Sequence, residues 1–140
     1  MLGQLHTPAV VHRTILGSWE RFLGVLTEHV AGRWPPWLAP LQARVLPVTD
    51  RQTDAARALV TELAGAGLRA GLGESDATLP KRVREAELER VPYVLVVGER
   101  EVADGTVSVR TRGQKATRSL SRPEFVALLL EKVRRRDFDP

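Results

Sequence analysis

The sequence predicts an α/β fold, a mixed sheet of about five strands flanked by helices, preceded by a separate strand and helix. A length of 140 residues with 43% hydrophobic content suits one ordinary domain with a real core. From Gln42 onward, apolar runs of strand length alternate with helical patterns. A proline-rich stretch at residues 34–40 separates this alternation from the earlier strand and helix. We therefore predict two parts, residues 1–40 and residues 41–140.

The first part is predicted to hold one strand and one amphipathic helix. Residues 8–16 are rich in valine and isoleucine, which favours a strand. Gly17 or Ser18 then begins a helix that reaches about Gly32. Its apolar residues recur at the spacing of one buried helix face. They are Phe22, Val25, Leu26, His29 and Val30.

A boundary between the two parts is predicted near Pro40. Three prolines within residues 34–40 exclude regular structure there. The second part then begins with a strand at residues 43–48, and Asp50 is the predicted N-cap of a helix that runs through Leu63. Residues 68–72 form a weaker predicted strand.

A second strand and helix pattern follows in the middle of the chain. Residues 79–90 form a charged helix, and residues 92–98 are an apolar, β-branched run typical of a central strand. A turn-like Ala-Asp-Gly sequence at residues 103–105 then predicts an antiparallel hairpin between residues 99–102 and residues 107–111.

The last predicted element is a helix that begins with a capping box. The Ser121 side chain can accept a hydrogen bond from the backbone of Glu124, whose own side chain reaches back. The apolar residues that follow define the face expected to pack on the sheet. They are Phe125, Val126, Leu129 and Val133.

The composition limits the classes of function. Of the 21 basic residues 18 are arginine, against 17 acidic residues, and arginine is the side chain best suited to phosphates and base edges. A GC-rich genome explains the same bias, because alanine, glycine and proline are also frequent. The absence of cysteine excludes disulfides, thiol nucleophiles and zinc–thiolate sites. We find neither an export signal nor a membrane-spanning run, and we expect a cytoplasmic protein.

The stretch between Gly105 and Pro123 is basic and contains no acidic residue. Its cations are Arg110, Arg112, Lys115, Arg118 and Arg122. Such a stretch either binds a nucleic acid or is a solvated loop and hairpin edge whose charges oppose aggregation.

Residues 12–22 resemble motif 3 of threonyl-tRNA synthetases, a strand that runs into a helix beside an arginine. The resemblance implies that Arg21 stacks over the adenine of ATP and that Ser18 lines the amino-acid pocket. It also implies that His12 is one of three zinc ligands, the other two lying in catalytic-domain segments that this sequence lacks. ATP and zinc are thus expected in the full enzyme, and neither is expected in this chain alone.

The rest of the chain is similar to the anticodon-binding domain that class IIa aminoacyl-tRNA synthetases share. The segments that carry this similarity are residues 48–50, 66–69, 90–93, 98, 101–102 and 107–112. The resemblance implies contacts with RNA. The residues concerned are Arg84, Glu101, Arg110, Arg112 and Lys115. The pairing of an arginine fork with guanine O6 and N7, and of a carboxylate with guanine donors, is chemically sound.

Residues 73–80 depart from the family pattern. Asp76 and Thr78 stand where an amide and a lysine are usual, which leaves readout of the third anticodon base open. This departure is the best support for an alternative, a non-enzymatic paralogue that binds RNA or a protein partner. An unrelated metabolic α/β domain is a third possibility, but the sequence has no Gly-rich phosphate loop, nucleophile elbow or acid pair.

The chain is accordingly identified as a member of the threonyl-tRNA synthetase family, corresponding to the C-terminal part. Its expected partner is the anticodon stem-loop of threonine tRNA. The full enzyme, a threonine-tRNA ligase, is expected to be a homodimer, whereas this chain alone is expected to be inactive.

Overall fold

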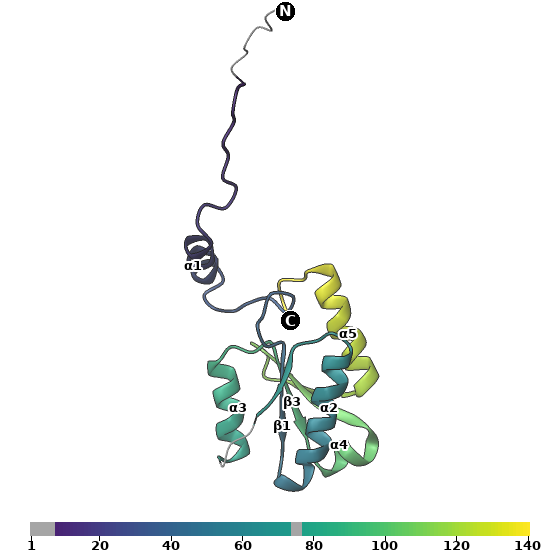
Figure 1. The fold of residues 1–140 in the computed structure, drawn as a ribbon. Helices are drawn as coiled ribbons and strands as arrows, with labels where there is room; N and C mark the ends of the chain where they lie inside the picture. The colour runs from purple at the N-terminus through teal and green to yellow at the C-terminus, as the bar shows by residue number, and fades with distance from the viewer. Residues whose placement is uncertain (1–7, 74–76) are drawn as a thin grey trace, which may run out of the picture.

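The computed structural model describes residues 8–73 and 77–140, and its centre is a five-stranded sheet (Figure 1). The strand order is β2-β1-β3-β4-β5. The strands are β1 (Ala43–Pro47), β2 (Ala70–Leu72), β3 (Tyr93–Val97), β4 (Thr106–Thr111) and β5 (Thr117–Ser121). The helices are α1 (Trp19–His29), η1 (Asp50–Gln52), α2 (Thr53–Gly65), α3 (Leu79–Leu88), α4 (Glu99–Asp104) and α5 (Arg122–Arg135).

The sheet has a parallel half and an antiparallel half. β1 lies between β2 and β3 and runs parallel to both, and the connections between them contain α2 and α3. β4 is antiparallel to β3, and β5 is antiparallel to β4. The predicted mixed sheet of about five strands flanked by helices is therefore confirmed.

The helices cover the two faces of the sheet unequally. α2 and α5 pack on one face, where they bury the main hydrophobic core, and Figure 1 shows α3 on the opposite side of the sheet. α3 closes a smaller core of Leu46, Val83, Ala86 and Val94. Phe125 and Leu129 of α5 are fully buried, as the sequence predicts. The predicted capping box of this helix is also present.

The predicted N-cap at Asp50 is wrong by one residue. Asp50 is the first residue of η1, and Thr49 is the residue that caps this turn. Its backbone N–H and its hydroxyl both donate to Oε1 of Gln52, at 3.1 and 2.7 Å. The amide side chain of Gln52 therefore holds the entry to α2 in place.

The predicted hairpin strand at residues 99–102 is wrong, because these residues begin α4. The backbone N–H of Gly98 donates to Oε2 of Glu101 at 3.0 Å, which satisfies an N-terminal donor of the helix. Gly105 ends the helix with φ +67, a conformation that glycine adopts without strain. The fifth strand of the sheet is instead β5, at residues for which the sequence predicted no strand.

The predicted strand at residues 8–16 is also wrong, since residues 8–14 have no regular structure. A strand needs a neighbour that accepts and donates its backbone hydrogen bonds, and no strand of the described chain lies beside this segment. Val10 and Val11 are 82% and 89% exposed.

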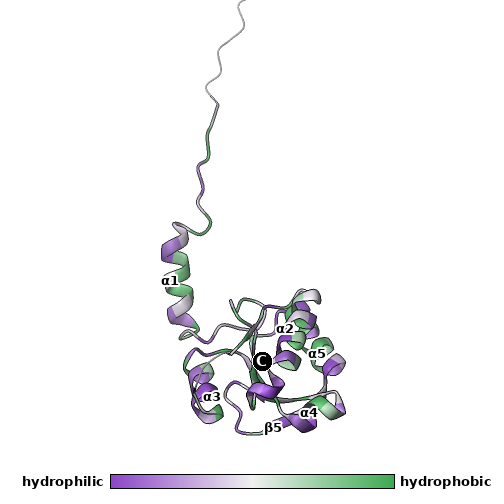
Figure 2. Ribbon diagram, turned by 60° about the horizontal axis from the view of Figure 1, so that its bottom comes forward, coloured by the Kyte–Doolittle hydropathy of each residue, from purple (hydrophilic) through white to green (hydrophobic). Residues whose placement is uncertain are grey.

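The α1 helix forms where it was predicted, but it buries none of its residues. Phe22, Leu26 and Val30 of the predicted buried face are half-buried, whereas Val25 and His29 are exposed. Figures 1 and 2 show α1 standing apart from the sheet and from the helices that cover it, with apolar residues along its length. The amphipathic pattern is thus real, but among the described residues no surface buries the apolar face of α1.

The proline-rich segment at residues 34–40 packs against the sheet domain. Pro35, Pro36 and Ala39 are buried. Arg69 holds the segment through two hydrogen bonds, from Nε to the Ala39 carbonyl at 2.9 Å and from Nη2 to the Trp37 carbonyl at 3.0 Å. These contacts give the segment a defined course without regular structure.

In the part of the chain that the structure describes, no helix combines the length and the apolar character that crossing a membrane requires.

Candidate nucleic-acid interface

The antiparallel half of the sheet leaves one face open and polar. Val107 and Val109 of β4 point into the main core, so the alternation of a strand turns Ser108 and Arg110 toward the opposite face. α3 covers that face only near Val94 and Leu46. The polar residues of β4 and their partners on β5 are therefore accessible beside α3.

Glu101 lies next to this open face with its carboxylate held in place. Oε1 accepts a hydrogen bond from the Ser108 hydroxyl at 2.8 Å, while Oε2 accepts the one from the Gly98 backbone. Burial raises the pKa of Glu101, but the hydrogen bonds from Ser108 and the backbone, with the charge of Arg100, outweigh it and lower the pKa overall. Glu101 is thus an oriented anion at neutral pH.

Arg110 occupies the same face, two residues along β4 from Ser108. At about 3.3 Å per residue, this places Arg110 roughly 7 Å along the strand from the residue that holds Glu101. Its Nη2 donates to Oε1 of Glu87, on the last turn of α3, at 3.2 Å. The open face therefore presents one oriented carboxylate and one oriented guanidinium.

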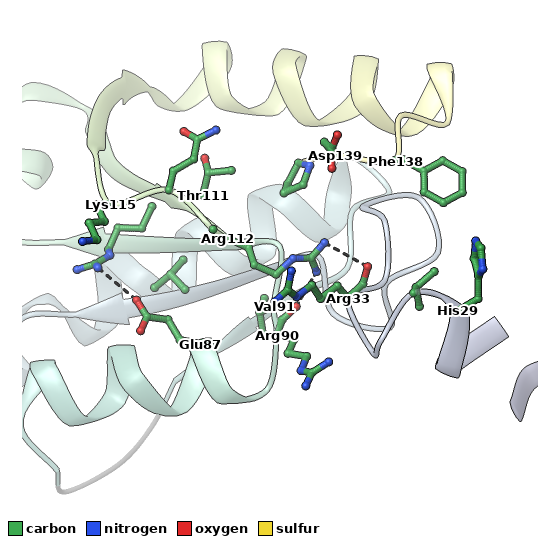
Figure 3. Close-up of a pocket in the computed structure, with 16 residues that line it drawn as sticks. His29, Arg33, Glu87, Arg90, Val91, Thr111, Arg112, Lys115, Phe138 and Asp139 are labelled. Atoms are coloured by element: carbon green, nitrogen blue, oxygen red, sulfur yellow. Dashed lines mark hydrogen bonds and ion pairs between the residues drawn. The ribbon is translucent and has the colours of Figure 1, made fainter. Parts of the chain in front are cut away.

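A cleft of about 900 Å³ opens beside Arg110 (Figure 3). It is formed by the residues that follow α1, the end of α3, the turn between β4 and β5, and the C-terminal residues. Its charged lining residues are Arg33, Glu87, Arg90, Arg110, Arg112, Lys115 and Asp139. The excess of cations favours an anionic ligand.

The structure brings together three of the five predicted RNA contacts in this cleft, namely Arg110, Arg112 and Lys115. Lys115 is exposed in the turn after β4, where Gly113 has φ +82. Arg84 is exposed on α3 and lies outside the cleft lining, as does Glu101. The predicted contacts therefore follow the open face and its edge instead of filling one pocket.

Arg112 differs from the other predicted contacts because backbone carbonyls surround it. Nη1 donates to the carbonyls of Trp34 and Arg90 at 2.9 and 2.8 Å, and Nη2 donates to the carbonyl of Arg33 at 3.4 Å. Figure 3 shows its side chain directed toward Arg33. Burial, followed by the nearby charge of Arg33, lowers the pKa of Arg112. Its fork is thus engaged within the protein.

The predicted ATP, amino-acid and zinc residues lie on the N-terminal part and are far less enclosed. Ser18 caps α1, since its Oγ accepts from the backbone N–H of Arg21 at 3.2 Å. Arg21 and His12 are exposed. Within residues 8–73 and 77–140, no group of three or more potential ligands is arranged to hold a metal ion. These residues alone do not fit a zinc or ATP site.

Sequence reasoning missed two residues of the open face. Ser108 has the period-2 position of a strand residue facing away from the core, which is a signal that could have identified it. The contact of Glu87 with Arg110 had no local signal, because it joins side chains 23 residues apart.

A family model described as the anticodon binding domain matches residues 42–132. Among curated relatives, the threonine–tRNA ligase of Thermus thermophilus is 45% identical over 138 residues, which is 99% of this chain and 21% of that protein. The threonine–tRNA ligase of Clostridioides difficile is 42% identical over 135 residues, or 96% of this chain and 21% of the relative. The chain thus spans about a fifth of the length of these relatives.

Solved structures agree with this assignment. The RNA-binding domain of threonyl-tRNA synthetase from Cryptosporidium parvum superposes with a TM-score of 0.80 at 34% identity, covering 86% of this chain and 30% of that chain. Prolyl-tRNA synthetase from the same organism has a TM-score of 0.63 at 24% identity over 72% of this chain and 23% of its own, which shows a shared fold alone. The chain therefore belongs to the anticodon-binding domain family and is homologous to the C-terminal region of threonyl-tRNA synthetases.

Proposed function

We propose that this chain recognises the anticodon of threonine tRNA through the open face of its sheet. The observation that carries the proposal is the placement of Glu101 and Arg110 on that face, each with a fixed orientation. Threonine anticodons have guanine at the central position. The carboxylate of Glu101 suits the Watson–Crick donors of guanine, and the fork of Arg110 suits its O6 and N7 acceptors.

Preorganisation supports this assignment. The Glu101 carboxylate is held by Ser108 and Gly98 before any RNA arrives, so binding does not have to order a flexible acid. Adenine at the same position lacks the N1–H and amino donors that guanine offers to this carboxylate. The geometry accordingly favours guanine over adenine.

The basic residues around this pair suit the phosphates of the anticodon loop. Lys115 is exposed in the β4–β5 turn and Arg84 is exposed on α3, whereas Arg118 pairs with Val109 and therefore projects from the opposite face of the sheet. Contacts with phosphates position an RNA without reading its sequence. We propose that Lys115 and Arg84 supply most of the salt-dependent affinity.

We propose a supporting role for Arg112 in place of direct base reading. Its guanidinium already donates to the carbonyls of Arg33, Trp34 and Arg90. It thereby shapes the floor of the cleft beside Arg110, and RNA binding does not have to break these hydrogen bonds.

In the full-length enzyme, we propose that this region serves ATP-dependent threonylation of tRNA. Residues 1–40 would then be the motif 3 segment of the catalytic domain and residues 41–140 the anticodon-binding domain. Zinc would have His12 as one of its ligands there. Arg21 and Ser18 would line the ATP and threonine pockets in a homodimeric enzyme. This chain by itself provides too few groups for either site.

Fluorescence titration of labelled anticodon stem-loops tests the proposal. The stem-loops carry guanine or adenine at the central position, and the proteins are wild type, Arg110→Ala and Lys115→Ala at two salt concentrations. Wild type should prefer guanine by roughly 5- to 150-fold, and Arg110→Ala should lose most of that preference. Lys115→Ala should weaken both complexes alike and leave the preference intact.

Equal affinity of the wild type for both stem-loops would remove anticodon recognition from this chain. General basic charge would then account for any remaining RNA binding. A non-enzymatic paralogue would then be the better interpretation of this chain.

A further inference from the structure

We infer that Glu87 is a specificity-determining positioning residue, which orients the Arg110 guanidinium toward a guanine edge and keeps it from turning to phosphates. The inference rests on the proposed function, in which Arg110 reads the central anticodon base. Neither the sequence patterns nor the family resemblance assigns a role to Glu87.

The core fixes the position of Glu87. Its neighbour Ala86 is buried and packs with Val83 against Val94. Val94 of β3 is in turn the register partner of Arg110 on β4. Apolar packing through β3 therefore fixes the distance between the helix that carries Glu87 and the strand that carries Arg110. The ion pair then orients the Arg110 side chain.

The ion pair between Glu87 and Arg110 orients the arginine side chain more than it stabilises the fold. The side chains of Arg110 and Glu87 are 36% and 55% exposed, and exposed pairs of this kind contribute little to folding. The contact is a single one, from Nη2 to Oε1 at 3.2 Å. A guanidinium has five N–H donors, so most of the fork is left to face a base. Figure 3 shows the side chain of Glu87 extending from α3 toward the strands at the cleft.

The surroundings explain why Arg110 needs such a partner. Lys115, in the turn that follows β4, lines the same cleft as Arg110 and attracts the RNA backbone there, and a long arginine side chain is equally able to follow a phosphate. The Glu87 carboxylate attracts one end of the guanidinium and repels phosphates from its vicinity. Both effects favour the base-reading orientation over the non-specific one.

The test compares Glu87→Ala with Glu85→Ala, a matched control. Glu85 is exposed on the same helix, and its removal changes the net charge equally without touching Arg110. Each protein is titrated with the guanine and adenine stem-loops, and circular dichroism checks that the helix is intact. Both variants should bind all RNAs somewhat more tightly, because one negative charge is lost.

The decisive quantity is the ratio of guanine to adenine affinity. Glu87→Ala should lower this ratio roughly fivefold or more, towards that of Arg110→Ala, and Glu85→Ala should leave it at the wild-type value. In the Arg110→Ala background, Glu87→Ala should have no further effect on the ratio, because the residue that it positions is absent.

Two outcomes would overturn the inference while leaving the proposed function standing. One is a Glu87→Ala ratio equal to that of a wild type that does prefer guanine. The other is a ratio that rises, which would show that Glu87 competes with guanine for the Arg110 guanidinium. A wild type without preference would instead remove the proposed function and this inference together.

Discussion

Arg112 donates a hydrogen bond of 2.9 Å from Nη1 to the carbonyl oxygen of Trp34, 78 residues earlier in the chain. The same guanidinium reaches Arg90 and Arg33. A single side chain at the end of β4 thus joins the segment that follows α1 to the loop that follows α3. Its backbone N–H also donates to the Pro92 carbonyl at 2.9 Å, which ties it to the start of β3.

Arg112→Lys should lower the free energy of unfolding by roughly 1–3 kcal/mol. A lysine ammonium is a compact charge that does not reproduce the planar fork, so part of the carbonyl set loses its donor. Urea unfolding followed by tryptophan fluorescence measures the change. Arg118→Lys is the control, because Arg118 is exposed on β5, and it should leave the stability unaltered. Equal urea midpoints for all three proteins would show that the Arg112 guanidinium does not contribute to the free energy of unfolding.

Burial raises the pKa of Tyr93 to about 12, and the negative charge of Asp137 adds to this rise. The neutral phenol is thus favoured in the folded state, and its contribution to stability is complete below pH 10 and is lost as the pH rises from about 10 to about 12. Tyr93 is the only tyrosine of the chain, so absorbance at 295 nm reports its ionisation alone. The midpoint of this titration should be near pH 12 for the folded protein in buffer and near pH 10 for the unfolded protein in urea.

Tyr93→Phe provides a second measurement at the same position. The Tyr93 hydroxyl is buried and has no hydrogen-bond partner among the residues that the structure describes. Its removal should therefore leave stability at pH 8 unchanged or slightly higher, and the variant should lose less stability than wild type between about pH 10 and pH 12. A marked destabilisation at pH 8 would reveal an unseen partner of the hydroxyl.

Lys115→Ala should flatten the salt dependence of RNA binding. A lost phosphate contact changes the slope of log affinity against log salt by roughly 0.7 to 0.9. Arg118→Ala, on the opposite face of β5, and Glu85→Ala should not flatten the slope. The slope is obtained from titrations of one stem-loop at four salt concentrations. An unchanged slope with a weakened guanine preference would show that Lys115 contacts a base and not a phosphate.

Amide hydrogen exchange should divide the chain sharply. Residues 10–16 have no regular structure and are exposed, so their amides should exchange at close to the unprotected rate. Residues 94–97 lie in the centre of the sheet between two strands and should be among the slowest. Comparable protection of both segments in a monodisperse monomer would contradict the exposed course of the N-terminal segment.

This chain alone should not catalyse threonine-dependent exchange of pyrophosphate into ATP. Arg21 is exposed on α1, and a single arginine does not hold ATP in line for reaction. Likewise, the chain should not retain stoichiometric zinc after dialysis, because His12 by itself supplies one ligand of the four that zinc usually requires. Exchange above a no-protein blank, or one zinc per chain by atomic absorption, would refute these expectations.

The sequence predicted most of the sheet domain because its signals there are local. The apolar run of β3, the helical pattern of α2 and the Ser121 capping box of α5 each act within a few residues. The strand at residues 8–16 was mispredicted because strand formation depends on neighbours, which a local apolar pattern does not supply. The β5 strand was missed for the opposite reason, since it is polar apart from Leu120 and its first three residues are exposed.

The candidate site was predicted residue by residue, but its internal contacts were not. The family resemblance named Glu101 and Arg110 without the groups that hold them. The bond from Ser108 to Glu101 arises because residues 99–104 form a helix, whereas the sequence predicted a strand at residues 99–102 and a turn at residues 103–105. The partners of Arg112 lie 22 to 79 residues away, a separation at which side-chain patterns carry no pairing information.

The unequal covering of the sheet separates the residues that fold the domain from those that recognise a ligand. β1 and β3 have packed helices on both faces, whereas Ser108, Arg110 and Ser119 project from the open face and belong to neither hydrophobic core. Substitutions at these three positions leave the buried set untouched. The domain is therefore a suitable scaffold for selecting new base preferences. A library of substitutions confined to this face varies RNA recognition and leaves the buried core residues unchanged.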